Sequence, residues 1–297
     1  MKQPVFTGSG VAIITPFTND GIDYPALARL LDFQLENGTD AIIVCGTTGE
    51  AAAMSYEERV RNIEAVVRHV DGRVPVIAGT GSNNTENAIA MSRDASGAGV
   101  DALLVVTPFY NKATPKGLIR HYTAVADAVE KPVILYHVPS RTGVKCTAEI
   151  YAALAEHPNI VGVKEAGGDL ALVQKTRELC PEDFYIWSGN DDETAPIMLF
   201  GGKGVISVAA NVMPEAMHRL TESCLNGDFV AAGQMQLKLR KLCEALFWEV
   251  NPIPVKTALA MMGYCQERFR SPMCEMEPEN RERLAGVLSE YGLLQAI

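Results

Sequence analysis

The sequence lacks the features of several large protein classes. No segment approaches the roughly 20 consecutive apolar residues that a membrane-spanning helix needs, and Met1–Gly10 lacks the charged and apolar regions of a signal peptide. Basic residues are scarce, because 26 Lys and Arg stand against 36 Asp and Glu, for a net charge of −10. A nucleic-acid-binding protein needs a basic face that neutralises phosphates. We therefore expect a cytoplasmic protein that binds neither a membrane nor a nucleic acid.

Cysteine and histidine show no arrangement that would hold a metal or a disulfide. The seven cysteines are an odd number without a Cys-x-x-Cys pair, which is typical of reduced thiols in the cytoplasm. The five histidines show no ligand spacing. Gly79-Thr80-Gly81 lacks the third glycine of a dinucleotide-binding fingerprint, and no Gly-x-Ser-x-Gly elbow is present. The sequence therefore predicts neither a metal nor an organic cofactor.

The sequence does contain a repeated alternation of strand and helix patterns. Eight runs are rich in Val, Ile and Leu, which is typical of parallel strands that are covered on both faces. The runs are Val11–Pro16, Ala41–Cys45, Val76–Gly79, Ala102–Thr107, Val133–Val138, Ile160–Lys164, Tyr185–Ser188 and Gly204–Val208. Helical periodicity follows each run, over Tyr24–Asn37, Ser55–Val70, Thr85–Ala98, Lys116–Val129, Thr147–His157, Leu170–Leu179, Thr194–Phe200 and Pro214–Leu225. Eight such units predict an α/β fold, a (β/α)8 TIM barrel, rather than a doubly wound open sheet.

The pattern changes after Asn226-Gly227-Asp228, where the strand-like runs stop. Phe229–Val250, Val255–Met262 and Pro278–Tyr291 show helical periodicity only. A chain of 297 residues is long enough for one barrel and an appendage. We therefore predict a catalytic barrel over residues 1–227 and a small C-terminal helical domain over residues 228–297.

Candidate chemistry lies where the predicted strands end, because the active sites of such barrels lie at the C-terminal ends of the strands. Lys164 ends the apolar run Ile160–Val163. A lysine there could simply extend to the barrel mouth or pair with an acid. Apolar surroundings favour the neutral amine, however, and a neutral amine attacks a ketone to form an imine that acidifies the adjacent carbon. Lys164 is therefore the candidate nucleophile.

This chemistry also needs groups that move protons. Tyr136 ends the preceding strand pattern, so it would either pack or act in the same barrel mouth as Lys164. Thr47 and Tyr110 follow two other strands and could extend a chain of hydroxyls from Tyr136. The four residues are our candidate catalytic set.

Two loops could hold the carboxylates of keto-acid substrates. Gly46-Thr47-Thr48-Gly49-Glu50 offers backbone N–H groups and hydroxyls to an anion, whereas Glu50 itself is expected to bond loop amides in a structural role. Arg141 is either a surface charge or a fork for a second carboxylate. Asn190–Glu193 is acidic enough to suggest a metal site, but we expect it to cap the start of a helix.

Several motifs resemble those of the dihydrodipicolinate synthase and N-acetylneuraminate lyase superfamily. They are Gly46–Glu50, Thr107–Asn111, Tyr136–Gly143, Val161–Ala166, Gly204–Ser207 and Asn251–Lys256. The resemblance covers nearly the whole chain and implies a (β/α)8-barrel lyase, commonly a homotetramer built from tight dimers.

The resemblance implies a reaction and a role for each candidate residue. Lys164 would form an imine with pyruvate, and the resulting enamine would attack L-aspartate 4-semialdehyde. Cyclisation would release 4-hydroxy-tetrahydrodipicolinate, in lysine and diaminopimelate biosynthesis. Tyr136 would donate and accept protons, and Thr47 and Tyr110 would relay them, with Tyr110 entering from a neighbouring subunit.

The implied substrate-binding residues are Thr48 and Ile206 for pyruvate and Arg141 for the semialdehyde. Arg141 lies in a Ser-Arg-Thr-Gly element that the sugar-acid branches of the superfamily lack. An alternative is a related aldolase that acts on a sugar-derived 2-keto acid, and another is a barrel that only binds pyruvate-like ligands. His137 stands where the superfamily usually has Asn, and we expect it to point away from the pocket because strand residues alternate.

Lysine-inhibited members bind lysine at a dimer interface. The matching positions here are Ala52, Tyr56, Arg59, Asn83, Asn87 and Phe109. The regulated pattern has a glutamate where Asn87 stands, so a carboxylate partner for the ligand's ammonium is missing, and Arg59 adds repulsion. We therefore predict weak or absent inhibition by lysine.

Overall fold

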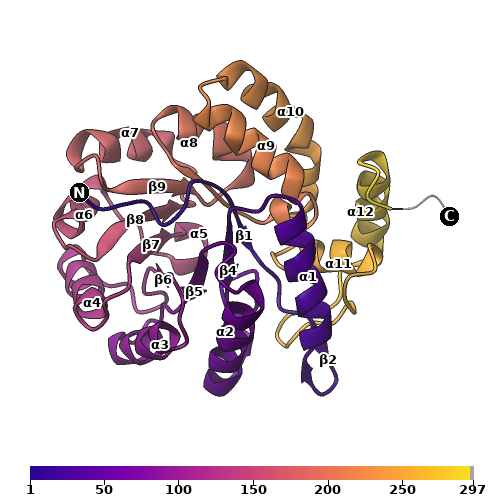
Figure 1. The fold of residues 1–297 in the computed structure, drawn as a ribbon, viewed down its shortest axis with the longest axis horizontal. Coiled ribbons are helices and arrows are strands. Elements are labelled where there is room, and N and C mark those ends of the chain that lie inside the picture. Colours follow the sequence, from indigo (N-terminus) through magenta and orange to yellow (C-terminus); the bar gives the residue numbers. More distant parts are fainter. Residues whose placement is uncertain (295–297) are drawn as a thin grey trace.

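Eight parallel strands form a closed barrel surrounded by helices (Figure 1). The computed structural model describes residues 1–294, so the last three residues of the predicted C-terminal domain, 295–297, lie outside it. In barrel order the strands are β1 (Gly8–Ala12), β10 (Gly204–Ser207), β9 (Tyr185–Ser188), β8 (Ile160–Glu165), β7 (Val133–His137), β6 (Ala102–Val106), β5 (Val76–Gly79) and β4 (Ala41–Val44). The predicted (β/α)8 barrel is confirmed.

Helices follow the barrel strands as the periodicity predicts. They are α1 (Tyr24–Glu36), α2 (Tyr56–Val70), α3 (Thr85–Gly97), α4 (Pro115–Asp127), α6 (Ala148–Ala155), α7 (Leu170–Leu179), α8 (Thr194–Leu199) and α9 (Pro214–Leu225). Shorter pieces are α5 (Pro139–Thr142) and the 3-10 turns η1 (Ala51–Ala53), η2 (Asp191–Glu193) and η3 (Ala209–Asn211). Ser55 and Glu58 form a capping box at the start of α2, in which each side chain bonds the other's backbone N–H.

The first strand differs from its prediction, because β1 begins at Gly8 rather than at Val11 and ends at Ala12. Glycines open this strand, and they lack the branched apolar side chains that mark the other strands in the sequence. Gly10 is required there by close packing, since an added Cβ would lie 2.8 Å from the Ile43 side chain. The chain beyond β1 forms a small antiparallel hairpin of β2 (Phe17–Thr18) and β3 (Gly21–Ile22).

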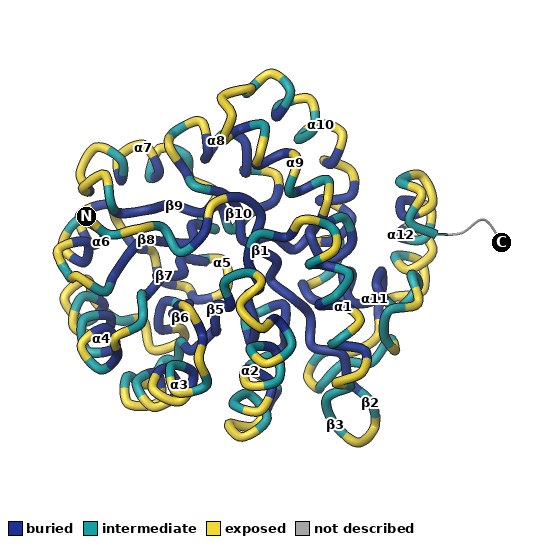
Figure 2. The backbone as a smooth tube through the Cα atoms, viewed as in Figure 1, coloured by how far each residue is buried: buried dark blue, intermediate teal, exposed yellow. Residues whose placement is uncertain are grey.

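Two apolar clusters lie on the two sides of the barrel wall. Figure 2 shows that the strands are buried and that the outer sides of the helices are exposed. The inner cluster fills the barrel with alternate strand residues, including Ile134, Tyr136 and Val138. Val133 and Leu135, on the opposite face of the same strand, belong to the outer cluster beneath the helices. This alternation fixes which residues can reach the barrel interior.

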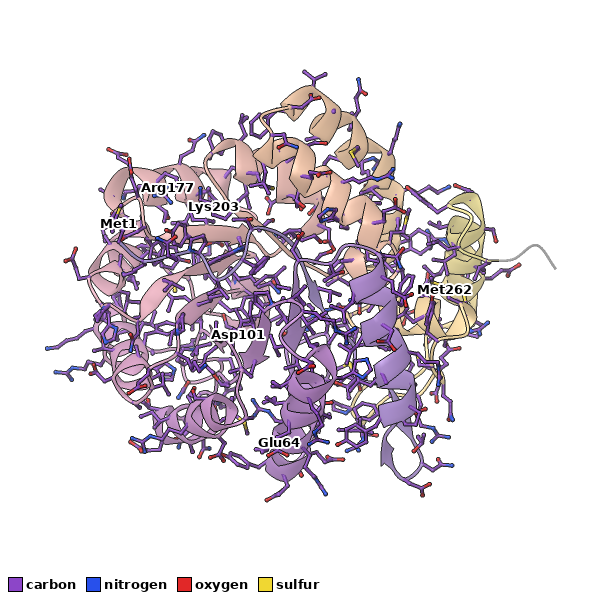
Figure 3. All side chains as sticks on the ribbon, in the orientation of Figure 1. Met1, Glu64, Asp101, Arg177, Lys203 and Met262 are labelled. Carbon is purple, nitrogen blue, oxygen red and sulfur yellow. The ribbon has the colours of Figure 1, made fainter. Side chains whose placement is uncertain are left out.

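The N-terminal segment closes the barrel at the N-terminal ends of the strands. Lys2 Nζ donates to the carbonyl of Ile160 at 2.8 Å, and the Tyr185 hydroxyl donates to the carbonyl of Lys2 at 2.7 Å. Met1, Arg177 and Lys203 line a shallow hollow at this end, and Figure 3 shows them near one another. This end of a barrel serves stability, so the active site is expected at the other end.

Helices are the only regular secondary structure in the C-terminal part of the described chain: α10 (Phe229–Ala245), α11 (Ile253–Met261) and α12 (Pro278–Glu290). The helix predicted over Phe229–Val250 ends earlier, because the chain turns after Ala245 and leads into Asn251-Pro252. The domain boundary at residue 227 remains a prediction. Within residues 1–294, no helix is both long and apolar enough to cross a membrane.

Candidate active site

Lys164 and Tyr136 lie side by side at the C-terminal ends of β8 and β7. The two residues are register partners in the parallel pair, and both are buried, with exposed fractions of 5% and 7%. Lys164 Nζ lies 4.3 Å from the centroid of the Tyr136 ring. An ammonium or amine over an aromatic face is an attractive contact. The structure therefore brings the predicted nucleophile and the predicted proton donor together.

A glycine on the neighbouring strand end makes room for this lysine. Gly189 follows β9, and a Cβ added there would lie 3.1 Å from Lys164 Cε and 2.6 Å from the Ala166 side chain. Any larger residue would press on the lysine stem. Gly189 was not singled out from the sequence, since its importance depends on a contact across two strands.

A cavity of about 430 Å³ opens at these strand ends. Its wall includes Thr47, Tyr136 and Arg141 from the predicted set, and also Phe109 and Asn251. Such a volume suits one or two small molecules. Lys164, Thr48 and Ile206 do not line this cavity. Lys164 lies behind its wall, in contact with the ring of Tyr136, which does line it.

Asn251 ties two predicted binding residues to the C-terminal helices. Its side-chain amide donates to Thr48 Oγ1 at 3.1 Å, and its carbonyl accepts from Arg141 Nη2 at 2.9 Å. Thr48 and Asn251 are buried, whereas Arg141 is exposed. The motif Asn251–Lys256 carried no assigned role in the sequence, because nothing local in it indicates a contact with Thr48, 203 residues earlier.

The two remaining candidates lie in different surroundings. Ile206 is fully buried in β10, within the same inner cluster as Tyr136. Tyr110 is 88% exposed and has a positive φ of 72°. A single chain therefore does not bring Tyr110 into the site, although its neighbour Phe109 lines the cavity.

Glu50 has the structural role predicted for it, but with other partners than its own loop. Its carboxylate pairs with the buried Lys256 ammonium at 2.5 Å and accepts from the backbone N–H of Arg270 at 3.0 Å. Burial lowers the pKa of Lys256, against the opposing effect of Glu50. This ion pair joins the loop Gly46–Glu50 to α11, so the C-terminal helices support the cavity wall.

Asp191, from the acidic run Asn190–Glu193, caps backbone N–H groups as predicted, but at a different turn. Its carboxylate accepts from Ser207 Oγ at 2.5 Å and from the N–H groups of Val208 and Ala209, at the end of β10 and the start of η3. Burial raises the pKa of Asp191, and its hydrogen bonds and Lys164 oppose that shift. In the described part of the chain, no group of three or more His, Cys, Asp or Glu side chains could hold a metal ion.

The fold and the site define a class of protein: a (β/α)8 barrel with a buried lysine against a tyrosine at its C-terminal mouth. Comparison with known proteins narrows this class. The model of the dihydrodipicolinate synthetase family matches residues 5–291. A 4-hydroxy-tetrahydrodipicolinate synthase from Thermoanaerobacter sp. (strain X514) is 52% identical over 294 residues, 99% of each chain.

Solved structures agree with the sequence comparison. Dihydrodipicolinate synthase from Aquifex aeolicus superposes with a TM-score of 0.96 at 45% identity, over 98% of this chain and 100% of that one. The chloride-inhibited enzyme from Acinetobacter baumannii, solved with pyruvate, has a TM-score of 0.95 at 42% identity, over 97% of this chain and 99% of that one.

The chain belongs to the dihydrodipicolinate synthetase family. These matches confirm the family predicted from the motifs. They also confirm the predicted lyase activity, that of 4-hydroxy-tetrahydrodipicolinate synthase, in preference to a sugar-acid aldolase or a non-catalytic barrel.

Proposed function

We propose that the chain condenses pyruvate with L-aspartate 4-semialdehyde through a covalent imine on Lys164. The observation that carries this proposal is the buried contact of Lys164 Nζ with the Tyr136 ring, 4.3 Å from its centroid. An amine held there is shielded from water and lies over the ring of a tyrosine, whose hydroxyl can exchange protons. No metal or organic cofactor takes part in the proposed reaction.

The proposed reaction has four steps. Lys164 Nζ forms a bond to C2 of pyruvate, and the carbonyl oxygen leaves as water. Loss of a methyl proton then gives the enamine, with Tyr136 and Thr47 moving the proton. The enamine carbon attacks the aldehyde carbon of the second substrate, the aldehyde oxygen takes up a proton to become a hydroxyl, and the imine to Lys164 forms again. Finally, that substrate's amine attacks C2 and displaces Lys164, which closes the ring of 4-hydroxy-tetrahydrodipicolinate.

The positions of the remaining residues support distinct roles in binding. Arg141 lines the cavity and offers a forked guanidinium to the carboxylate of the semialdehyde. Thr48 and Ile206 stand deeper, where the smaller pyruvate would be held. Tyr110 would enter a neighbouring subunit's site in a homotetramer of tight dimers, and its exposure beside the cavity-lining Phe109 supports this role. Such an enzyme would work in the cytoplasm.

A substrate panel tests the proposal. Steady-state rates are measured with pyruvate and L-aspartate 4-semialdehyde, and in parallel with sugar-derived 2-keto acids in the cleavage direction. We expect turnover of the semialdehyde alone, with Arg141→Gln as a matched variant whose KM for the semialdehyde rises while its KM for pyruvate is retained. Turnover confined to the sugar acids would refute the proposed substrate.

Weak or absent lysine inhibition forms part of the same proposal. Arg59 lines the cavity, its Nη2 donates to the carbonyl of Gly79 at 2.9 Å, and its guanidinium makes no ion pair with a carboxylate of residues 1–294. An uncompensated positive charge repels the ammonium of a lysine ligand. We expect millimolar lysine to leave the initial rate nearly unchanged, and strong inhibition would contradict this expectation.

A further inference from the structure

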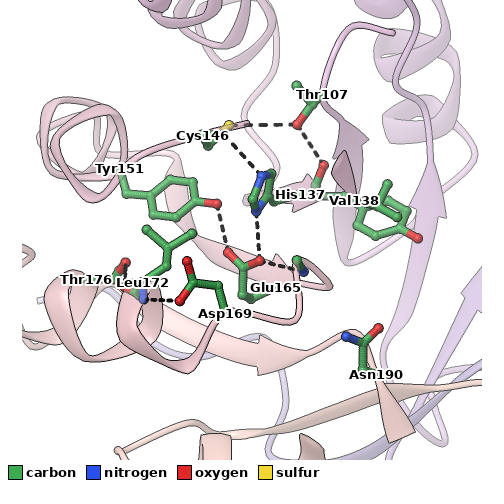
Figure 4. A network of polar contacts seen from close by, with 12 residues as sticks. Thr107, His137, Val138, Cys146, Tyr151, Glu165, Asp169, Leu172, Thr176 and Asn190 are labelled. Carbon is green, nitrogen blue, oxygen red and sulfur yellow. Dashed lines mark hydrogen bonds and ion pairs between the residues drawn. The ribbon is translucent and has the colours of Figure 1, made fainter. Parts of the chain in front are cut away.

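A buried polar pair lies directly behind the proposed reactive pair. His137 follows Tyr136 on β7 and Glu165 follows Lys164 on β8, and the two are themselves register partners. Both are 3% exposed. Because side chains alternate across a strand, His137 and Glu165 face the helices while Tyr136 and Lys164 face the barrel interior. We call His137 and Glu165 the outer pair, and Figure 4 shows the contacts around them.

Three donors converge on the Glu165 carboxylate. His137 Nδ1 lies 2.7 Å from Oε1, the N–H of Gly167 donates to Oε1 at 2.8 Å, and the Tyr151 hydroxyl donates to Oε2 at 2.9 Å. Burial and then the nearby Glu165 charge raise the pKa of Tyr151 well above 10, so its phenol stays a donor. Glu165 is thus satisfied on both oxygens without water.

The other ring nitrogen of His137 fixes the orientation of the imidazole. Nε2 accepts from the backbone N–H of Cys146 at 3.1 Å, so it carries no hydrogen. Nδ1 must therefore carry the hydrogen and donate it to Glu165. One neutral side chain in this way connects β7, the segment before α6, and β8.

The turn after β8 closes tightly over the outer pair. A Cβ added to Gly167 would lie 2.7 Å from Glu165 Oε1 and 3.1 Å from His137 Cε1. The backbone adds two further connections: the N–H of Ala166 donates to the carbonyl of His137 at 2.9 Å, and the N–H of Gly189 donates to that of Glu165 at 2.7 Å. The strand ends that carry Tyr136 and Lys164 are therefore joined on the outer side.

We infer that the hydrogen bond from His137 to Glu165 positions the reactive pair by fixing β7 against β8 where Lys164 lies over Tyr136. Both members are positioning residues, since neither lines the cavity. A displacement of about 1 Å at a reacting group can lower a rate by about 100-fold. The inference rests on the proposed imine mechanism.

Two substitutions of His137 test its two hydrogen bonds one at a time: the bond to Glu165 and the bond to Cys146. His137→Asn places an amide N–H near the position of Nδ1, so it keeps a donor for Glu165 but loses the acceptor for Cys146. His137→Gln reaches toward the position of Nε2, so it keeps the acceptor but loses that donor. Glu165→Gln is the companion variant, since its amide oxygen can still accept from His137 and Gly167 while its NH2 donates to Tyr151.

The measurements are kcat per imine-forming site, KM for pyruvate, and the melting temperature. Sites are counted by mass spectrometry after pyruvate and borohydride treatment of the full-length protein. We expect His137→Asn and Glu165→Gln to stay within about threefold of wild-type kcat per site, and His137→Gln to fall by about 30-fold or more with KM nearly unchanged.

The inference is overturned if His137→Gln is as active per site as His137→Asn. It is equally overturned if His137→Gln loses melting temperature while its kcat per trapped site stays at the wild-type value, because the pair would then serve stability alone. An untrappable wild-type protein would instead overturn the proposed function, so the two failures are distinguishable.

Discussion

The two faces of β7 and β8 differ in how many hydrogen bonds their side chains make with other groups of the protein. On the outer face, the Glu165 carboxylate takes three donors and both nitrogens of His137 are bonded. On the inner face, the Lys164 amine and the Tyr136 hydroxyl form no hydrogen bond with another group of residues 1–294, and their contact is of amine with ring. The same strand ends thus carry a fully hydrogen-bonded pair, His137 and Glu165, and a pair whose side chains make no hydrogen bond within that part of the chain, Lys164 and Tyr136.

This difference shows how a barrel can hold reactive groups without blocking them. An amine that must attack a ketone cannot be occupied by a permanent acceptor, so its position has to be fixed by other atoms. The next residue along the strand can fix this position, because its side chain points to the opposite face and can make all of its hydrogen bonds there. Changes on the inner face should therefore lower the rate, and changes on the outer face should also lower stability.

The largest effect is expected for Lys164→Ala on the inner face. Removing the only proposed nucleophile should lower kcat/KM by about 10⁴-fold or more. The folding free energy should change by about 1 kcal/mol or less, because the side chain leaves no buried partner unsatisfied. Steady-state kinetics and urea unfolding measure the two quantities. A loss of several kcal/mol in stability would show that Lys164 is also a structural residue.

Tyr136→Phe is expected to have the next largest effect. The ring and its contact with Lys164 remain, while the hydroxyl that moves protons is lost, which should lower kcat by about 10²- to 10⁴-fold. Borohydride trapping should still yield the pyruvate adduct on this variant, although more slowly. A variant with wild-type kcat would remove Tyr136 from the proposed proton path.

Glu165→Leu tests the outer face and should lower stability, in addition to the fall in kcat that follows from losing the bond to His137. It leaves three donors without an acceptor: the buried side chains of His137 and Tyr151 and the half-buried N–H of Gly167. We expect a loss of about 3 kcal/mol or more in the free energy of unfolding, with Glu165→Gln retaining stability within about 1 kcal/mol. Equal stability of the Leu and Gln variants in urea unfolding would contradict the described difference between the faces.

The sequence predicted the barrel well because parallel strands buried on both faces are nearly continuous in Val, Ile and Leu. It misplaced β1, whose Gly10 packs closely against Ile43 and Phe6, a contact that no local pattern indicates. The motifs also identified Lys164 and Tyr136, but only the register of β7 with β8 shows that they meet.

Residues whose roles depend on distant contacts were beyond the sequence. Asn251 and Lys256 lie in a motif that carried the resemblance, but their contacts with Thr48 and Glu50 join segments about 200 residues apart, and no local signal predicts them. Gly189 matters through its approach to Lys164 on the neighbouring strand, which the sequence alone does not indicate. Tyr110 presents the opposite case, since the resemblance assigned it a role that a single chain cannot display.

The proposed covalent chemistry is tested most directly by reductive trapping. Wild-type protein is incubated with pyruvate and borohydride, digested and mapped by mass spectrometry, with Lys164→Ala as the control. We expect one reduced pyruvyl group per chain, located on Lys164 and missing from the control. An unmodified Lys164, or an adduct that persists in the Lys164→Ala variant, would contradict the imine mechanism.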